Sequence, residues 1–301
     1  MSDQREFLAQ WSQSQGNLRR FLEERVMPPL DDDAQRTAGR QKIPPPDPEV
    51  PQDTEAAAFF DVDNTLIQGS SLILLAQGLF KKRFITLSEL APALRKQIRY
   101  RVSGSENADD IAEGREQALA IVKGKSVEEL KQACREIVDN RMLQKSYADT
   151  IELASMHLAA GQQVWLVSAT PVQIGQALAE TLGFTGALGT VAEEEDGKFT
   201  GRLVGDILHG PGKKHAVAAL AALQQLDLSK CTAYSDSVND LPMLNMVGSP
   251  VAVNPDRALR KHAKAQGWAV RDYRSVRRVM RAGVVPAVLA AAGLWWWRRR
   301  R

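Results

Sequence analysis

Short apolar runs alternate with amphipathic segments along most of the chain after residue 56. Apolar runs of about five residues are typical of buried strands, and apolar positions three or four residues apart are typical of helices. Strands are predicted at 57–62, 163–168, 231–235, 250–253 and 268–270, with helical patterns such as 171–182 and 213–224 between them. This alternation favours an α/β fold with a doubly wound parallel sheet and right-handed crossovers.

A long insertion separates the first two predicted strands. Helical patterns at 71–80, 86–103, 107–123 and 126–140 fill this interval, and no convincing strand interrupts them. Further on, two short runs flank Asp196-Gly197, a pair typical of a tight hairpin turn. We therefore predict a core made of residues 54–69 and 157–273, with residues 70–156 forming a helical cap.

Both ends of the chain differ from this body. Residues 1–27 have apolar positions at helical spacing, which predicts an amphipathic helix. Residues 28–53 contain seven of the 14 prolines, so an extended, disordered linker is expected there. From residue 271 to 301, nine arginines and one acid give a charge of +8. Because the whole chain carries +3, the remainder carries −5. This asymmetry indicates an anionic partner for the tail, residues 274–301.

Within the tail, residues 282–297 form an uncharged run that ends in three tryptophans. A spanning helix needs about 20 apolar residues, whereas this run has sixteen and contains a proline and two glycines. Tryptophans beside arginines are typical of a segment at an anionic membrane surface. Three interpretations stay open: contact with the inner face of the cytoplasmic membrane, a genuine span, or a disordered or self-packed tail. A nucleic-acid partner is not expected, because the arginines lack a groove-reading fold.

The cysteines and the N-terminus predict a cytoplasmic protein. Cys134 and Cys231 lie far apart and lack the spacing of a metal site or a redox motif. A disulfide framework is therefore not expected, which fits a reducing compartment. The first residues contain no apolar core of signal-peptide length. If the tail binds lipid, the protein would be peripheral at the membrane.

Polar side chains follow three of the predicted strands, at the point where each strand ends. The carboxyl ends of parallel strands meet at one edge of a sheet, where ligands gather. The residues are Asp61 and Asp63 after the first strand, Ser168 after the second, Asp236, Asn239 and Asp240 after the third, and Lys213 at the start of a helix.

Each of these residues has a structural explanation when taken alone. Paired aspartates can form a turn, and Ser168 can be a helix N-cap. Lys213 can be a solvated lysine, with Lys214 as a competitor for its role. The DSVND run can be a surface turn or a structural calcium loop. Their order, with each one at a strand end or a helix start, favours a common site instead.

Carboxylates and a lysine at one edge of a sheet suit chemistry on phosphate. A carboxylate can attack phosphorus to form an acyl-phosphate. A second carboxylate two residues later points to the same side of the strand and can transfer protons. Because the carboxylates and the phosphate are all anionic, Mg²⁺ is the expected cofactor. A lysine, a hydroxyl group and N–H groups at a helix start can hold phosphate oxygens.

The motifs DVDNTL (61–66), VSATP (167–171), Lys213 and YSDSVNDLPML (234–244) follow one another in an order that identifies a known family. The chain resembles the haloacid-dehalogenase (HAD) superfamily, subfamily IB, and within it the phosphoserine-phosphatase-like hydrolases of the actinobacterial branch. The likeness spans about residues 54–273. It implies a Rossmann-like core with a helical cap after the first strand. The implied activity is Mg²⁺-dependent hydrolysis of a phosphomonoester through an aspartyl-phosphate.

The resemblance also implies roles for individual residues. Asp61 would be the nucleophile and Asp63 the general acid/base. The implied metal ligands are Asp61, Asp236 and the backbone carbonyl of Asp63. The implied phosphate binders are Asn64, Ser168, Ala169 and Lys213, and the implied supports of the metal site are Asn239 and Asp240.

Two positions on the cap side depart from the phosphoserine phosphatases. The family has a glutamate for the substrate ammonium nine residues after the nucleophile, and this chain has Ser70 there. Near the place of the family's cap arginine lies Ala118, with Arg115 about one turn away as the candidate substitute. A lost charge-assisted contact costs about 1.5–3 kcal/mol, so the resemblance supports the reaction more than phosphoserine as substrate. The alternatives are a phosphatase of lipid or lysolipid headgroups and a non-enzymatic scaffold.

Overall fold

The computed structural model describes residues 43–86, 89, 118–205 and 207–274. Several predictions concern other parts of the chain and lie outside the described residues. These are the helix at 1–27, most of the helical patterns at 86–103 and 107–123, Arg115, and the tail after Arg274.

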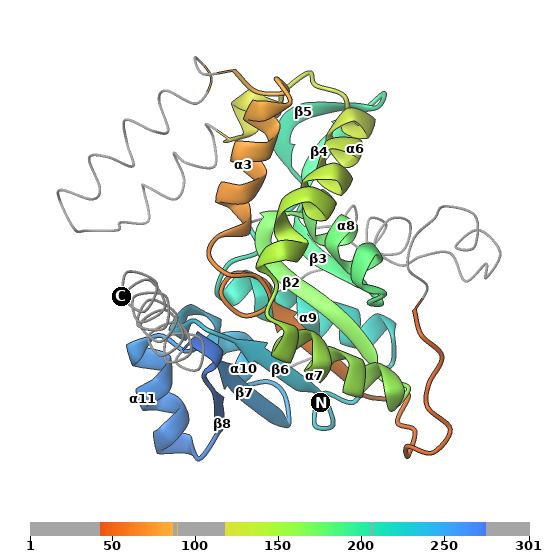
Figure 1. The fold of residues 1–301 in the computed structure, drawn as a ribbon, viewed down its shortest axis with the longest axis vertical. Helices are drawn as coiled ribbons and strands as arrows, with labels where there is room; N and C mark the ends of the chain where they lie inside the picture. The colour runs from red at the N-terminus through yellow and green to blue at the C-terminus, as the bar shows by residue number, and fades with distance from the viewer. Residues whose placement is uncertain (1–42, 87–88, 90–117, 206, 275–301) are drawn as a thin grey trace, which may run out of the picture.

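A six-stranded parallel sheet forms the core (Figure 1). Its order is β3-β2-β1-β6-β7-β8, and every neighbouring pair is parallel. The order reverses between β1 and β6, and the crevice at such a switch point is where doubly wound sheets bind ligands. The predicted fold class is therefore confirmed. The strands are β1 (Ala57–Asp61), β2 (Gln163–Pro171), β3 (Gly186–Thr190), β6 (Thr232–Ser235), β7 (Ser249–Val253) and β8 (Ala269–Arg271).

Helices cover both faces of the sheet. Adjacent residues of β1 serve opposite faces, since Phe60 packs in the core under α7 and α8 and Phe59 in the core under α9, α10 and α11. Both phenylalanines are fully buried, which explains why β1 has a continuous apolar sequence. The helices are α7 (Ala148–Ala159), α8 (Val172–Leu182), α9 (Pro211–Leu223), α10 (Leu241–Leu244) and α11 (Arg257–Gln266).

Strand β3 was missing from the sequence prediction. Its sequence, GALGT, contains two glycines and no β-branched residue before its last position, so local propensity does not indicate a strand. Pairing with β2 creates it. A Cβ at Gly186 would lie 2.5 Å from the Trp165 ring, so the glycine leaves room for this buried tryptophan.

A smaller unit lies above the sheet in the view of Figure 1. It contains α3 (Ser71–Lys81), α6 (Val127–Ile137) and the hairpin of β4 (Ala192–Glu195) and β5 (Lys198–Leu203). The Phe199 N–H donates to the carbonyl of Lys125 at 3.1 Å, and the Val127 N–H donates to that of Gly197 at 2.9 Å. The hairpin, predicted as part of the core, therefore contacts the segment around the start of α6, which is predicted as part of the cap. The Asp196-Gly197 turn occurs as predicted, with both residues at positive φ, 49° and 75°.

Two boundaries differ from the prediction. A π-helical turn (Val138–Met142) and a 3-10 turn (Leu143–Lys145) follow α6, and α7 then packs against the sheet. In α7, Thr150 Oγ1 donates to the carbonyl of Thr65 at 2.9 Å. The predicted boundary at residue 156 therefore falls inside α7, a helix that packs on the core. The last residues of the predicted linker also contact α7, because the Asp47 N–H donates to the carbonyl of Ala159 at 2.8 Å.

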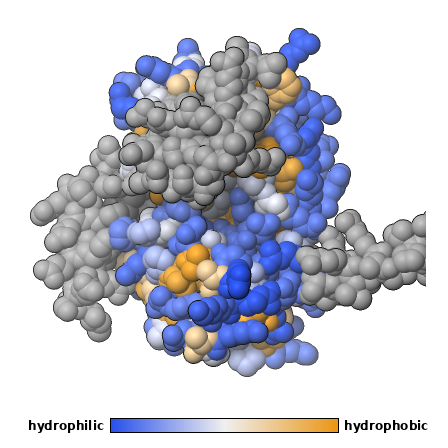
Figure 2. All heavy atoms as spheres, turned by 90° about the vertical axis from the view of Figure 1, so that its left-hand side faces the viewer, coloured by the Kyte–Doolittle hydropathy of each residue, from blue (hydrophilic) through white to orange (hydrophobic). Residues whose placement is uncertain are grey.

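The described surface is mainly hydrophilic on the face drawn in Figure 2, and apolar side chains lie there in small groups. The exposed large hydrophobic residues include Leu72, Ile73 and Phe80, all on α3. In the part of the chain that the structure describes, no helix is long and apolar enough to cross a membrane.

Gly248 lies where two backbone segments meet, just before β7. A Cβ there would be 1.7 Å from the carbonyl oxygen of Ser229. Because this obstacle is backbone, the segments would have to separate. We expect Gly248→Ala to lower the free energy of unfolding by about 3 kcal/mol, measured by urea denaturation. Gly175→Ala in α8 is the control, since its added carbon meets only the Ala187 Cβ, at 3.1 Å, and alanine favours the helix. Equal effects of the two changes would contradict this explanation.

Candidate active site

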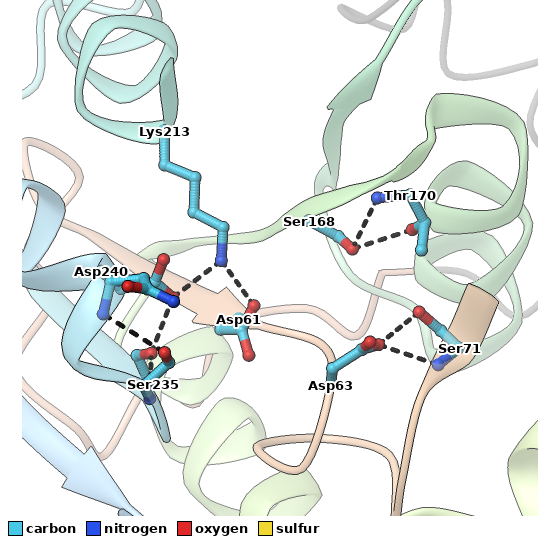
Figure 3. Close-up of polar contacts among 10 residues, drawn as sticks. Asp61, Asp63, Ser71, Ser168, Thr170, Lys213, Ser235 and Asp240 are labelled. Atoms are coloured by element: carbon cyan, nitrogen blue, oxygen red, sulfur yellow. Dashed lines mark hydrogen bonds and ion pairs between the residues drawn. The ribbon is translucent and has the colours of Figure 1, made fainter. Parts of the chain in front are cut away.

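The predicted lysine and two of the predicted aspartates meet at the switch point of the sheet (Figure 3). Asp61 is the last residue of β1, and Lys213 lies in the first turn of α9. Lys213 Nζ is 2.6 Å from Asp61 Oδ1 and 2.7 Å from Asp240 Oδ2. All three side chains are buried. A charged group at this depth is stable only with paired counter-charges, so the three residues form one electrostatic unit.

The start of α9 explains why Lys213 enters the site. Gly210 precedes the helix with a positive φ of 51°, and Pro211 occupies its first turn, where a proline fits. Lys213 is 3% exposed, whereas Lys214 lies on the exposed side of the helix. Of the two candidates from the sequence, Lys213 is therefore the one that contacts the aspartates.

The buried charges shift one another's protonation. Burial raises the pKa of Asp61 to about 8; Lys213 opposes this shift, and the carboxylates of Asp240 and Asp236 add to it. Burial lowers the pKa of Lys213, but Asp61 and Asp240 raise it more, so its pKa lies above the ordinary value. Lys213 is thus a permanent cation at neutral pH, and its contact favours ionisation of Asp61.

Asp236 follows β6, across the switch point from Asp61. Burial raises the pKa of Asp236 to about 6, although a hydrogen bond from the Asn64 side chain opposes the shift. Asn64 has a positive φ of 54°, and its Oδ1 accepts the N–H of Gly69 at 3.1 Å. The structure therefore places Asn64, predicted as a phosphate binder, against the candidate metal ligand Asp236.

The oxygen atoms at this edge suit Mg²⁺. Asp61 and Asp236 provide carboxylates. The resemblance to the haloacid-dehalogenase superfamily implies the backbone carbonyl of Asp63 as a third ligand. Among the described residues, no group of three or more Asp, Glu, His or Cys side chains could hold a metal by itself. Mg²⁺ commonly uses one or two carboxylates and completes its shell with water and phosphate oxygens. Two carboxylates and one carbonyl therefore fit this ion.

Asp63 is held by the first residue of α3. Asp63 Oδ1 accepts the backbone N–H of Ser71 at 2.9 Å and also the Ser71 hydroxyl. The acid/base candidate is thereby fixed at a helix N-terminus, where a carboxylate is favoured. Ser70, predicted as a specificity residue, is the N-cap by position, but its side chain makes no capping hydrogen bond. The role of Ser71 was not predicted. The only indication in the sequence was that a serine stands at the start of a predicted helix.

Ser168 and Ala169 lie in the last part of β2. Ser168 Oγ accepts the Thr170 N–H at 3.2 Å and lies 2.8 Å from Thr170 Oγ1. The pairing register with β3 shifts between Val167 and Pro171. Since α8 begins only at Val172, Ser168 is not a helix N-cap. Ser168 is buried, and Ala169 is exposed.

The last residue of β6, Ser235, holds Asp240 by a hydrogen bond. Ser235 Oγ donates to Asp240 Oδ2 at 2.7 Å and accepts the Ser237 N–H at 3.1 Å. Asn239, in the 3-10 turn Val238–Asp240, is exposed. The sequence does not indicate a role for Ser235, because a serine inside a strand resembles an ordinary core position. Asp240 therefore positions Lys213, and its own orientation is set by Ser235.

Comparison with known proteins agrees with this site. The family described as haloacid dehalogenase-like hydrolase matches residues 58–245. Phosphoserine phosphatase SerB1 of Mycobacterium tuberculosis (strain ATCC 25618 / H37Rv) is 52% identical over 248 residues, covering 82% of this chain and 80% of that protein. A solved structure of a protein with unknown function from Bordetella pertussis Tohama I is 30% identical with a TM-score of 0.64, covering 73% of this chain and 99% of that one.

A substrate-bound phosphoserine phosphatase complex shares the fold. It is 19% identical with a TM-score of 0.51, covering 77% of this chain and 99% of that one. The family match spans more than half of the chain, and the mycobacterial relative is similar over most of its length. The chain therefore belongs to the haloacid dehalogenase-like hydrolases, and it is a phosphatase of the phosphoserine-phosphatase-like kind.

Proposed function

We propose that this phosphatase requires Mg²⁺ and hydrolyses a phosphomonoester through an aspartyl-phosphate on Asp61. The observation that carries the proposal is the buried contact of 2.6 Å between Asp61 and Lys213 at the end of β1. A carboxylate beside a permanent cation at a switch point can attack an anionic phosphate, because the cation offsets the repulsion.

The proposed reaction has two chemical steps, which use Asp61 and Asp63. First, an Asp61 oxygen forms a bond to phosphorus, the bond to the substrate alkoxide breaks, and Asp63 gives a proton to that alkoxide. Second, Asp63 takes a proton from a water molecule, which attacks phosphorus and releases phosphate and free Asp61. Mg²⁺, when bound, would neutralise the charge that gathers on the phosphate and carboxylate oxygens. Ser71 holds Asp63 in place for both transfers.

Metal removal tests the cofactor. Assayed with 4-nitrophenyl phosphate, the full chain should lose at least about 100-fold in turnover after treatment with EDTA, because two carboxylates and a phosphate would meet without their cation. Excess Mg²⁺ should restore the rate. A rate that EDTA leaves unchanged would contradict metal dependence.

The intermediate has its own readout. With a phosphorus-labelled substrate and acid quenching, label should stay on the protein and be released by hydroxylamine, since an acyl-phosphate reacts with that nucleophile. If metal-dependent turnover leaves no labelled protein, direct attack by water is the mechanism.

A lipid headgroup phosphomonoester is the second candidate substrate. Ser70 carries no charge, and Leu72 and Ile73, in the first turn of α3, are 53% and 49% exposed beside the residue that holds Asp63. An apolar surface there suits an acyl chain better than an amino acid. The test compares kcat/KM for lysophosphatidate and L-phosphoserine. A matched test pellets the full chain and a chain lacking residues 282–301 with anionic liposomes. A preference for phosphoserine, or equal pelleting, would count against this candidate.

A further inference from the structure

Asn254 is a polar residue in an unusual place. It directly follows β7, is fully buried, and has a positive φ of 47°. Residues other than glycine rarely adopt this conformation, although asparagine tolerates it better than most. A buried amide in such a conformation needs hydrogen bonds that hold it there.

The Asn254 amide joins two distant parts of the chain. Its Nδ2 donates to the backbone carbonyl of Asn64 at 2.8 Å. Its Oδ1 accepts the N–H of Tyr273 at 2.8 Å and that of Arg274 at 3.3 Å. The loop after β1 is therefore tied to the segment after β8 through one side chain.

Asn64 lies in the loop that follows β1, one residue after Asp63. Two residues beyond Asn254, the Asp256 N–H donates to the backbone carbonyl of Asp236 at 2.7 Å. The short segment 254–256 thus holds the loops that follow β1 and β6, which carry Asp63 and Asp236.

We propose that Asn254 is a positioning residue that holds the backbone of the loop after β1 at the distance from the Asp236 loop that metal binding needs. The inference rests on the proposed metal dependence. Asn254 itself touches neither the phosphate nor the metal. Residues that orient metal ligands typically contribute about 10- to 100-fold in metal affinity.

Removal of the side chain tests this role. Asn254→Gly keeps the backbone conformation, because glycine adopts positive φ freely. Titration of the full-length variant with Mn²⁺, followed by electron paramagnetic resonance, should give a Kd at least about tenfold above that of the unchanged protein. Leu259→Ala is the matched control, since Leu259 is fully buried on α11, in the core that contains Phe59. It should lower the thermal midpoint but leave the Mn²⁺ affinity within about twofold.

A double-mutant cycle separates positioning from general stability. Asn64 also has a positive φ, so Asn64→Gly is equally compatible with the backbone. Asn254 contacts the backbone carbonyl of residue 64, which Asn64→Gly keeps. Asn254→Gly should therefore weaken Mn²⁺ binding about as much in the Asn64→Gly background as in the unchanged protein. An effect that disappears in that background, or an unchanged Kd in a folded Asn254→Gly variant, would overturn the proposal. If Asn254→Gly does not fold, Asn254→Ser gives the same comparison, because its shorter side chain cannot reach both partners.

Metal titration and turnover keep the two proposals apart. If the unchanged protein binds Mn²⁺ but hydrolyses no phosphomonoester, the proposed reaction fails while the titrations still decide the role of Asn254. If it does not bind Mn²⁺, the positioning role fails together with the metal dependence.

Discussion

Replacing Asp61 with asparagine is expected to lower turnover by about 10⁴-fold or more, the size of loss seen when other enzymes lose a nucleophile. An amide cannot form the bond to phosphorus. The fold should survive, because asparagine has the same shape and Lys213 keeps its contact of 2.7 Å with Asp240. Turnover of 4-nitrophenyl phosphate with Mg²⁺ measures the loss, and circular dichroism checks the fold.

The control for Asp61→Asn is Asp149→Asn, on the exposed side of α7. The same chemical change there should leave turnover within about twofold, as expected for a surface position away from the site. The hydroxylamine-labile label should appear on the unchanged protein and on Asp149→Asn but be missing from Asp61→Asn. Turnover and label in the Asp61→Asn variant would exclude Asp61 as the nucleophile.

The sequence predicted the strands whose residues are apolar without a break. β1, with its five buried residues, is one example, and its two phenylalanines face the two separate cores. It could not predict β3, because GALGT becomes a strand only by pairing with β2. It also could not place the β4–β5 hairpin beside α6, since the contact of Phe199 with Lys125 joins residues far apart in the chain.

The candidate site divides in the same way. Asp61, Asp63 and Asp236 are found from the sequence because each stands at the end of a predicted strand within a motif. Ser71 and Asn254 are not, because each is a single polar residue whose role depends on another residue that it contacts, Asp63 for Ser71 and Asn64 for Asn254. The distance between Asn64 and Asn254 along the chain leaves no local pattern that would connect them. Long-range hydrogen bonds therefore mark the limit of what one sequence predicts here.

Replacing Lys213 with methionine should affect both activity and stability. Its Nζ is the buried cation between Asp61 and Asp240, and methionine fills a similar volume without charge. Loss of a group that stabilises charge in the transition state costs about 10²–10³-fold in turnover. The exposed neighbour offers a matched control, because Lys214→Met removes the same charge from the same helix turn and should change turnover by less than about twofold.

The stability loss of Lys213→Met should depend on pH in a defined direction. The pKa of Lys213 is raised above its ordinary value of 10.5, so the stabilisation by this cation is fully present at pH 8. Its removal takes away the charge that lowers the pKa of Asp61, so ionisation of this buried carboxyl is less favourable in the variant at pH 8. Breaking a buried ion pair costs about 3–5 kcal/mol. At pH 5 the Asp61 carboxyl is protonated in both proteins, because its pKa is raised to about 8, so this part of the loss disappears. Urea denaturation should therefore show a larger gap between Lys213→Met and the unchanged protein at pH 8 than at pH 5. A gap that stays constant, or one that Lys214→Met shows equally, would mean that the buried pairing is not what stabilises this edge of the sheet.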